Sequence, residues 1–222
     1  MSIDVQTDRF TALRQRMVNE QVRARGVRDE RVLAAMAKVP RHLFVDEEYQ
    51  EQAYEDHPIP IGEGQTVSQP LIVALMLEAL SLAGPETVLE VGTGSGYQTA
   101  LLGELALRVY SVERLPELAR CAAARLEGLG YTNVSASVGD GSLGLPEKAP
   151  FDAIVVSAAA PDIPQALLEQ LREGGRLVVP VGPAHAQELQ LVRKHQGRAE
   201  VVGLEGCRFV PLIGEQGYGG GW

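Results

Sequence analysis

Cysteine is scarce in this 222-residue sequence, which contains only Cys121 and Cys207. Two cysteines this far apart offer neither a disulfide framework nor the ligand spacing of a zinc site, and they favour a reducing compartment. No stretch approaches the roughly 20 consecutive apolar residues that span a bilayer. The first ten residues mix charged and polar side chains and lack the apolar segment of a signal peptide. We therefore expect a cytoplasmic protein with no membrane partner and no bound metal.

Positive charge is also in short supply, because 20 lysines and arginines stand against 29 aspartates and glutamates, a formal charge of −9. A nucleic-acid partner needs a basic surface, so this balance argues against one, although small cationic or zwitterionic ligands stay open. Apolar residues make up 45% of the chain, which is enough to offset the entropy lost when a domain of this size folds. The composition predicts one globular domain, and we expect a monomer.

The chain is predicted to begin with two helices. Apolar residues recur mostly at three- and four-residue steps between Phe10 and Val22, which predicts an amphipathic helix that Gly26 ends. Asp29 is a candidate N-cap for a second helix, which Pro40 stops.

Residues 41–65 contain many turn-forming residues and show no sustained period. We interpret them as a long ordered connection, which in compact domains often carries function. The apolar run 71–77 then predicts a largely buried helix, with Ser68 as its candidate N-cap and Pro70 in its first turn.

From Thr87 onward, short apolar runs alternate with helical stretches, which is typical of a parallel sheet covered on both faces. The last runs follow one another without a helix, which predicts antiparallel strands at one edge. The chain from Gly217 onward is glycine-rich and is predicted to be loose. The predicted strands are 88–91, 109–112, 134–138, 153–156, 177–179, 189–192, 201–202 and 209–210, and the predicted helices are 97–107, 116–128 and 164–173.

A glycine-rich loop, residues 92–96, lies between a predicted strand and a predicted helix. Glycines at this position let the backbone turn tightly and approach a ligand at the carboxyl end of the strand. Glu113 ends the next strand, 21 residues after Gly92, where a carboxylate can accept hydrogen bonds from ribose hydroxyls. Both features fit a nucleoside cofactor, and a ligand-free glycine turn is the alternative.

Two details favour S-adenosylmethionine over a dinucleotide. The dinucleotide fingerprint places its third glycine at position 97, which here is Tyr97. Glu90, just before the loop, would repel a pyrophosphate but favour a sulfonium or an ammonium group. Asp140 follows the third strand and is placed to approach an adenine edge, although an Asp-Gly turn explains it equally well.

The sequence resembles the protein-L-isoaspartate O-methyltransferase family. The resemblance rests on QTVSQP (65–70) and VLEVGTGSGY (88–97), and it covers roughly residues 17 to 212. The glycine loop is generic to methyltransferases, whereas the TVSQP segment is specific to this family. Further matching stretches are VPRHLFV (39–45), YSVER (110–114), GDG (139–141), APFD (149–152) and RFVPL (208–212).

The resemblance implies an enzyme that transfers a methyl group from S-adenosyl-L-methionine to the free α-carboxyl group of L-isoaspartyl residues in damaged peptides and proteins. The methyl ester then closes to a succinimide, whose hydrolysis returns some normal aspartate. The implied fold is α/β, with a doubly wound, mostly parallel seven-stranded sheet of the Rossmann-like methyltransferase type, N-terminal helices and an antiparallel C-terminal edge. We expect one domain, with an N-terminal extension (1–70), a cofactor-binding core (71–212) and a flexible tail (213–222).

The same resemblance assigns roles to individual residues. Ser68 is implied to be the active-site residue, although an ordinary N-cap is the alternative for a serine before a proline-containing helix start. The implied substrate contacts are Thr66, Val67, Ser68 and Val210. The implied cofactor contacts are Glu90, Gly92, Thr93, Gly94, Ser95, Gly96, Glu113, Asp140 and Gly141.

Three other readings of the sequence remain open. A methyltransferase acting on an amine or a hydroxyl would usually need a general base near the methyl group, and the sequence suggests none. A nicotinamide dehydrogenase conflicts with the third-glycine position and with Glu90. A scaffold that binds cofactor without activity conflicts with the presence of both Ser68 and the glycine loop.

Overall fold

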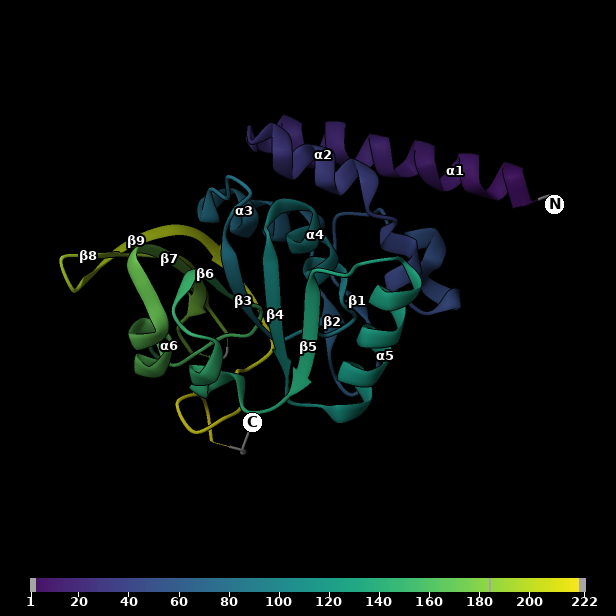
Figure 1. Cartoon of the computed structure of the whole chain (residues 1–222). Helices are drawn as coiled ribbons and strands as arrows, with labels where there is room; N and C mark the ends of the chain where they lie inside the picture. Colours follow the sequence, from purple (N-terminus) through teal and green to yellow (C-terminus); the bar gives the residue numbers. More distant parts are fainter. Residues whose placement is uncertain (1–2, 184, 220–222) are drawn as a thin grey trace.

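The computed structural model describes residues 3–183 and 185–219. Its centre is a seven-stranded sheet with the strand order β5-β4-β3-β6-β7-β8-β9 (Figure 1). Strands β5, β4, β3, β6 and β7 run parallel, and β8 and β9 pair antiparallel at one edge. This arrangement confirms the predicted α/β fold and its antiparallel edge. The strands are β3 (Thr87–Val91), β4 (Arg108–Glu113), β5 (Val134–Val138), β6 (Phe151–Val156), β7 (Leu171–Val181), β8 (Gln187–His195) and β9 (Arg198–Cys207).

Helices surround this sheet, and the first of them changes type along its length. Helix α1 (Ile3–Arg16) continues as the π-helix η1 (Met17–Val22) and the 3₁₀ turn η2 (Arg23–Arg25), and it ends at Gly26 in the left-handed conformation. Helix α2 (Glu30–Lys38) is capped by Asp29, whose carboxylate accepts two backbone N–H groups as predicted. The remaining α-helices are α3 (Pro70–Leu80), α4 (Tyr97–Leu105), α5 (Pro116–Gly128) and α6 (Gln165–Gln170).

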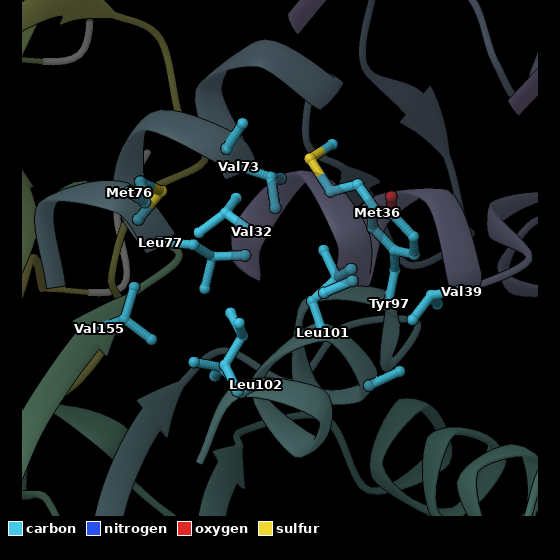
Figure 2. Close-up of a cluster of buried hydrophobic side chains, with 14 of the residues drawn as sticks. Val32, Met36, Val39, Val73, Met76, Leu77, Tyr97, Leu101, Leu102 and Val155 are labelled. Atoms are coloured by element: carbon cyan, nitrogen blue, oxygen red, sulfur yellow. The ribbon is translucent and has the colours of Figure 1, made fainter. Parts of the chain in front are cut away.

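Alternate side chains of the central strands enter two separate apolar clusters. In β3, Val88 packs with α2, α3 and α4 on one face, and Leu89 and Val91 pack with α6 on the other. Figure 2 shows part of the first cluster, in which residues of α2, α3 and α4 meet Val155 of β6. Because both faces of the central strands β3 and β6 are buried, these two strands consist mostly of apolar residues.

The region between α2 and α3 contains short elements in place of the single long connection. They are the 3₁₀ turns η3 (Arg41–Phe44) and η4 (Glu47–Gln52) and a two-stranded ribbon of β1 (Ile59–Pro60) and β2 (Thr66–Val67). Two further 3₁₀ turns, η5 (Gly141–Leu143) and η6 (Pro146–Lys148), precede β6.

Three sequence predictions about the C-terminal part need correction. Strand β7 begins at Leu171, and α6 is correspondingly shorter, because a bulge around Gly174 lets the chain pair with Phe151 earlier than the apolar run indicates. Phe209 and Val210 form no strand, because the chain leaves the sheet after Cys207. It runs along the carboxyl ends of the strands instead, where Pro211 forms an isolated bridge with Ala159.

The expected flexible tail is packed against the core over residues 213–219. The Tyr218 N–H donates to the carbonyl of Leu212, and the Glu215 N–H donates to Asp140. Glycine allows this close packing, because a Cβ atom on Gly214 would lie 2.1 Å from an Asp140 oxygen. Residues 220–222, the end of the predicted loose segment, lie outside the described residues.

Candidate active site

Strands β3 and β6 are neighbours in the sheet, and the order in which successive strands are added reverses between them. From β3 the chain proceeds to β4 and β5 on one side, and from β6 it proceeds to β7 on the other. In open α/β sheets the crevice at this switch point, beyond the carboxyl ends of the strands, is where ligands bind. A cavity of about 830 Å³, part of it open to solvent, lies at this position.

Two groups of predicted residues, which come from different parts of the chain, line this cavity. One group, here called the loop wall, consists of Gly92, Thr93, Gly94, Ser95 and Glu113. The other group, here called the serine wall, consists of Thr66, Val67 and Ser68. Val210 and Gly141 also line the cavity, whereas Glu90, Gly96 and Asp140 do not.

The loop wall follows from the backbone conformation of its glycines. Gly92, Gly94 and Gly96 have φ angles of 92°, 54° and 89°, which L side chains rarely adopt. Gly96 is the N-cap of α4, so the loop passes directly from the end of β3 into the helix. A Cβ on Gly96 would lie 3.3 Å from Ala122 of α5, which explains why this glycine holds the loop without facing the cavity.

Glu113 is held in place by the loop itself. Its two carboxylate oxygens accept the backbone N–H groups of Gly94 at 2.9 Å and Leu115 at 3.0 Å. Each oxygen keeps a free lone pair, so the carboxylate can accept further hydrogen bonds from a ligand in the cavity.

Glu90 lies behind the loop wall and is fully buried. One of its oxygens accepts the hydroxyl groups of Thr99 at 2.5 Å and Ser111 at 2.7 Å, and the other has no hydrogen-bond partner within the described ranges. Burial raises the pKa of Glu90 to about 7, although the two hydroxyl groups oppose this shift. Glu90 therefore does not contact the cavity directly, and its negative charge would act on a ligand through the loop.

Asp140 also supports the residues around the cavity without lining the cavity itself. It accepts the backbone N–H and hydroxyl of Ser142 through one oxygen and the Glu215 N–H through the other. It therefore fastens the C-terminal segment to the turn after β5. The neighbouring Gly141 does line the cavity, where a Cβ would lie 2.4 Å from Val91.

Ser68 belongs to the chain that joins β2 to α3. The predicted N-cap role is wrong, because Gln69 occupies the N-cap position and α3 has no side-chain cap. Pro70 already fills the first helical position, so the serine lies one residue too early to reach the free N–H groups. Within the described chain, no residue hydrogen-bonds the Ser68 hydroxyl, which lies at the cavity.

A second cavity, of about 1110 Å³ including space open to solvent, adjoins the first. Thr66, Ser68, Ser157 and Val210 line both cavities, so they form the boundary between them. In the described ranges, His185 is the one histidine that lines either cavity. This boundary is where groups bound in the two cavities would meet.

The structure adds residues that the sequence analysis missed. The side-chain amide of Gln98 donates to the Ser157 hydroxyl at 2.8 Å, and both residues line the first cavity. Ser157 directly follows β6, so its place at the end of a predicted strand was an available signal. Pro211, Leu212 and Ile213 also line the cavity, and their contact depends on the path of the C-terminal segment.

No helix in the described part of the chain is long and apolar enough to cross a membrane. Among the same residues, no group of histidine, cysteine, aspartate and glutamate side chains is arranged to hold a metal ion.

Comparison with known proteins identifies relatives along nearly the whole chain. A profile of the family "Protein-L-isoaspartate(D-aspartate) O-methyltransferase" matches residues 12–217. Protein-L-isoaspartate O-methyltransferases from Koribacter versatilis and Methanoculleus marisnigri are each 58% identical to this chain. The first match covers 94% of this chain and 94% of the relative, and the second covers 93% and 94%.

Solved structures lead to the same family. A protein-L-isoaspartate O-methyltransferase structure superposes with a TM-score of 0.84 at 30% identity, covering 92% of this chain and 67% of the other. A Plasmodium falciparum structure of the same description, in complex with S-adenosyl-L-homocysteine, superposes with a TM-score of 0.79 at 26% identity. It covers 90% of this chain and 98% of the other.

Proposed function

Because the chain belongs to the protein-L-isoaspartate(D-aspartate) O-methyltransferase family, we propose that its two adjoining cavities divide the methyl-transfer reaction between them. The enzyme methylates isoaspartyl residues with S-adenosylmethionine, which starts the repair of damaged proteins. In our proposal the first cavity holds S-adenosylmethionine, and the second holds the peptide around the isoaspartyl residue. The boundary residues then lie where the substrate carboxyl group meets the methyl group.

The residues of the first cavity fit S-adenosylmethionine in shape and charge. Gly92 and Gly94 leave the floor of the cavity free of side chains, and Glu113 offers lone pairs for ribose hydroxyl groups. Glu90 and Glu113 place two carboxyl groups beside the loop, an arrangement that suits a cationic ligand better than a pyrophosphate. When bound, S-adenosylmethionine supplies a methyl group that the positive charge of its sulfonium makes electrophilic.

The reaction needs no general base from the protein. The substrate carboxyl group has an ordinary pKa near about 4, so it is already an anion at neutral pH and has a lone pair available for the methyl group. The absence of a histidine–carboxylate pair at the boundary, in the ranges that the structure describes, is consistent with this chemistry. The protein has to orient the carboxylate, and orientation can contribute roughly 7–11 kcal/mol in favourable cases.

Ser68 is the residue to which we assign this orientation. Ser68 lines both cavities, and no described residue hydrogen-bonds its hydroxyl, so the hydroxyl is free to donate a hydrogen bond to one carboxylate oxygen. The other oxygen then points at the methyl group. Thr66, Val67 and Val210 shape the space around the substrate carboxyl group, and Val210 adds an apolar surface to the boundary. The observation that carries the proposal is that Thr66 and Ser68 of the serine wall line both cavities.

Methyl transfer to two matched peptides tests the proposal. The peptides have the same sequence and differ only in one residue, which is aspartate in one and isoaspartate in the other, and the methyl group of S-adenosylmethionine carries the label. We expect label on the isoaspartyl peptide alone, in a form that mild base releases, because carboxyl methyl esters hydrolyse readily. Base-stable label, or equal label on both peptides, would contradict the assigned substrate group.

A further inference from the structure

Arg41 is a fully buried arginine next to the serine wall. Its Nε donates to the carbonyl of Ala53 at 2.8 Å, and its Nη2 donates to the carbonyl of Ser68 at 2.9 Å. Its Nη1 has no hydrogen-bond partner among the residues that the structure describes. An interior guanidinium is costly to bury without partners, so these hydrogen bonds hold the guanidinium and the two carbonyl groups together.

A line of stacked side chains leads from Arg41 to the loop wall. The guanidinium carbon lies 4.8 Å from the ring centre of Tyr97, and the Tyr97 ring meets the Phe44 ring edge-on with centres 5.6 Å apart. Arg125 lies over the other side of this pair, 5.8 Å from the Phe44 ring centre, and its Nη1 donates to the carbonyl of Ser95 at 2.7 Å. We call these four residues the arginine–aromatic stack.

The two arginines at the ends of the stack donate to backbone carbonyl groups of the two walls. Ser68 belongs to the serine wall and Ser95 to the loop wall, and Tyr97 is the first residue of α4, directly after the loop. Tyr97 is itself fixed within the apolar cluster of Figure 2, so the stack cannot slide. The stack therefore spans the distance between the walls through packed, inflexible groups.

We propose that Arg41 is a positioning residue for methyl transfer, which sets the distance between Ser68 and the glycine loop through the arginine–aromatic stack. This inference rests on the proposed role of Ser68. Without the Arg41 guanidinium, the Ser68 carbonyl loses its donor and Tyr97 loses its stacking partner. The serine then drifts relative to the loop, and a displacement of about 1 Å can lower turnover roughly 100-fold.

Arg31 supplies a matched control for Arg41. It also joins two backbone carbonyls, those of Leu82 at 2.8 Å and Leu105 at 2.9 Å, but these lie at the far ends of α3 and α4, away from both cavities. Replacing either arginine by methionine removes two hydrogen bonds to backbone carbonyls. Arg31 is exposed, whereas Arg41 is fully buried, so Arg31→Met controls for the loss of carbonyl hydrogen bonds, and the Tm values report the additional cost of changing a buried side chain.

The experiment compares Arg41→Met, Arg41→Lys and Arg31→Met by kcat, by KM for the isoaspartyl peptide, by the Kd of S-adenosylhomocysteine and by thermal unfolding. We expect Arg41→Met to lower kcat roughly 30- to 100-fold while the Kd changes less than threefold, and Arg41→Lys to recover part of the loss. Arg31→Met should lower Tm and keep kcat. An Arg41→Met protein with normal kcat, or with a kcat loss that Arg31→Met matches, would overturn the inference.

A second pair of variants covers the case in which Arg41→Met fails to fold. Arg125→Met removes one end of the stack, and Arg120→Met, on the same helix, removes an exposed ion pair with Glu117 and a contact with the Cys121 sulfur. We expect kcat to fall several-fold in Arg125→Met and to stay unchanged in Arg120→Met. Equal kcat values in the two variants would contradict a role for the stack.

Ser68→Ala separates failure of this inference from failure of the proposed function. If Arg41 acts through Ser68, Arg41→Lys should lower kcat far less in the Ser68→Ala background than in the wild type, because the positioned group is already gone. Equal losses in both backgrounds would overturn the inference and leave the role of Ser68 intact. A Ser68→Ala enzyme with full turnover would instead overturn the proposed role of Ser68 itself.

Discussion

The loop wall and the serine wall both line the first cavity, yet different interactions hold them in place. The loop wall continues a central strand, and its glycines are fixed between β3, α4 and the backbone-bonded carboxylate of Glu113. The serine wall follows a two-residue strand, β2. It depends on side chains from distant positions, chiefly Arg41 on the Ser68 carbonyl and Asp56 on the N–H of Leu71.

This difference separates two tasks of the enzyme. A wall that continues the sheet inherits the rigidity of a backbone hydrogen-bond network, which suits the recognition of one invariant ligand. A wall held by a few side chains can be placed where the reaction needs it, but one substitution can move it. We therefore expect changes in the serine wall to affect turnover and changes in the loop wall to affect cofactor affinity.

The largest effect that sharpens this comparison is expected from Ser68→Ala. Loss of the hydroxyl removes the donor that orients the substrate carboxylate, so kcat should fall roughly 100-fold. The Kd of S-adenosylhomocysteine should stay within about twofold, because Ser68 does not support the loop. Kinetics with the isoaspartyl peptide and calorimetry give the two quantities, with Ser135→Ala on exposed β5 as the control. An equal loss of cofactor affinity would show that Ser68 serves the loop wall as well.

A smaller effect, on cofactor affinity and not on turnover, is expected from Gly92→Ala. Its φ of 92° costs an L side chain about 1–2 kcal/mol, so the loop relaxes in the free enzyme and binding must restore it. S-adenosylmethionine should bind roughly tenfold more weakly by calorimetry, with kcat at saturation nearly unchanged.

Gly197→Ala is the control for this strain. Gly197 has a φ of 70° in the turn between β8 and β9, where a Cβ would have open space around it. Weaker cofactor binding in both variants would show that general destabilisation is responsible.

The smallest effect concerns Glu90→Gln. Because burial raises the pKa of Glu90 to about 7, its negative charge develops between pH 6 and 8, and a bound cation favours it. Affinity for S-adenosylmethionine should rise roughly threefold over this range in the wild type and stay flat in Glu90→Gln. S-adenosylhomocysteine, which lacks the sulfonium charge, should show a weaker rise. Identical pH profiles for the two proteins would remove the charge argument.

The raised pKa of Glu90 also predicts how the free energy of unfolding depends on pH. The unfolded chain loses the Glu90 proton near pH 4.5 and the folded chain near pH 7, so the free energy of unfolding should fall as pH rises between these values. Glu90→Gln should lack this fall, and urea unfolding at pH 5 and pH 8 measures it.

The sequence predicted the loop wall better than the serine wall, and the reason is physical. A strand, a glycine loop and a helix are contiguous, so residues 88–105 carry their own structural signals. Glu113 could be placed because parallel strands end at the same edge of the sheet. Ser68 was indicated only by resemblance, and its local pattern pointed wrongly to an N-cap.

Long-range contacts account for what could not be predicted. Arg41 precedes Ser68 by 27 residues, and nothing in the periodicity of residues 41–65 indicates that its side chain is buried. Gln98 and Ser157 form a hydrogen bond although they are 59 residues apart in the sequence. The glycine-rich end of the sequence predicts a loose segment, whereas the missing side chain of Gly214 allows close packing against Asp140.

The path of the C-terminal segment links ligand binding to the order of this segment. Leu212 and Ile213 line the first cavity, and Asp140 fastens the segment by accepting the Glu215 N–H. A ligand that fills the cavity contacts this wall only while the segment is folded against the core. Cofactor binding and the folded state of the segment therefore stabilise each other.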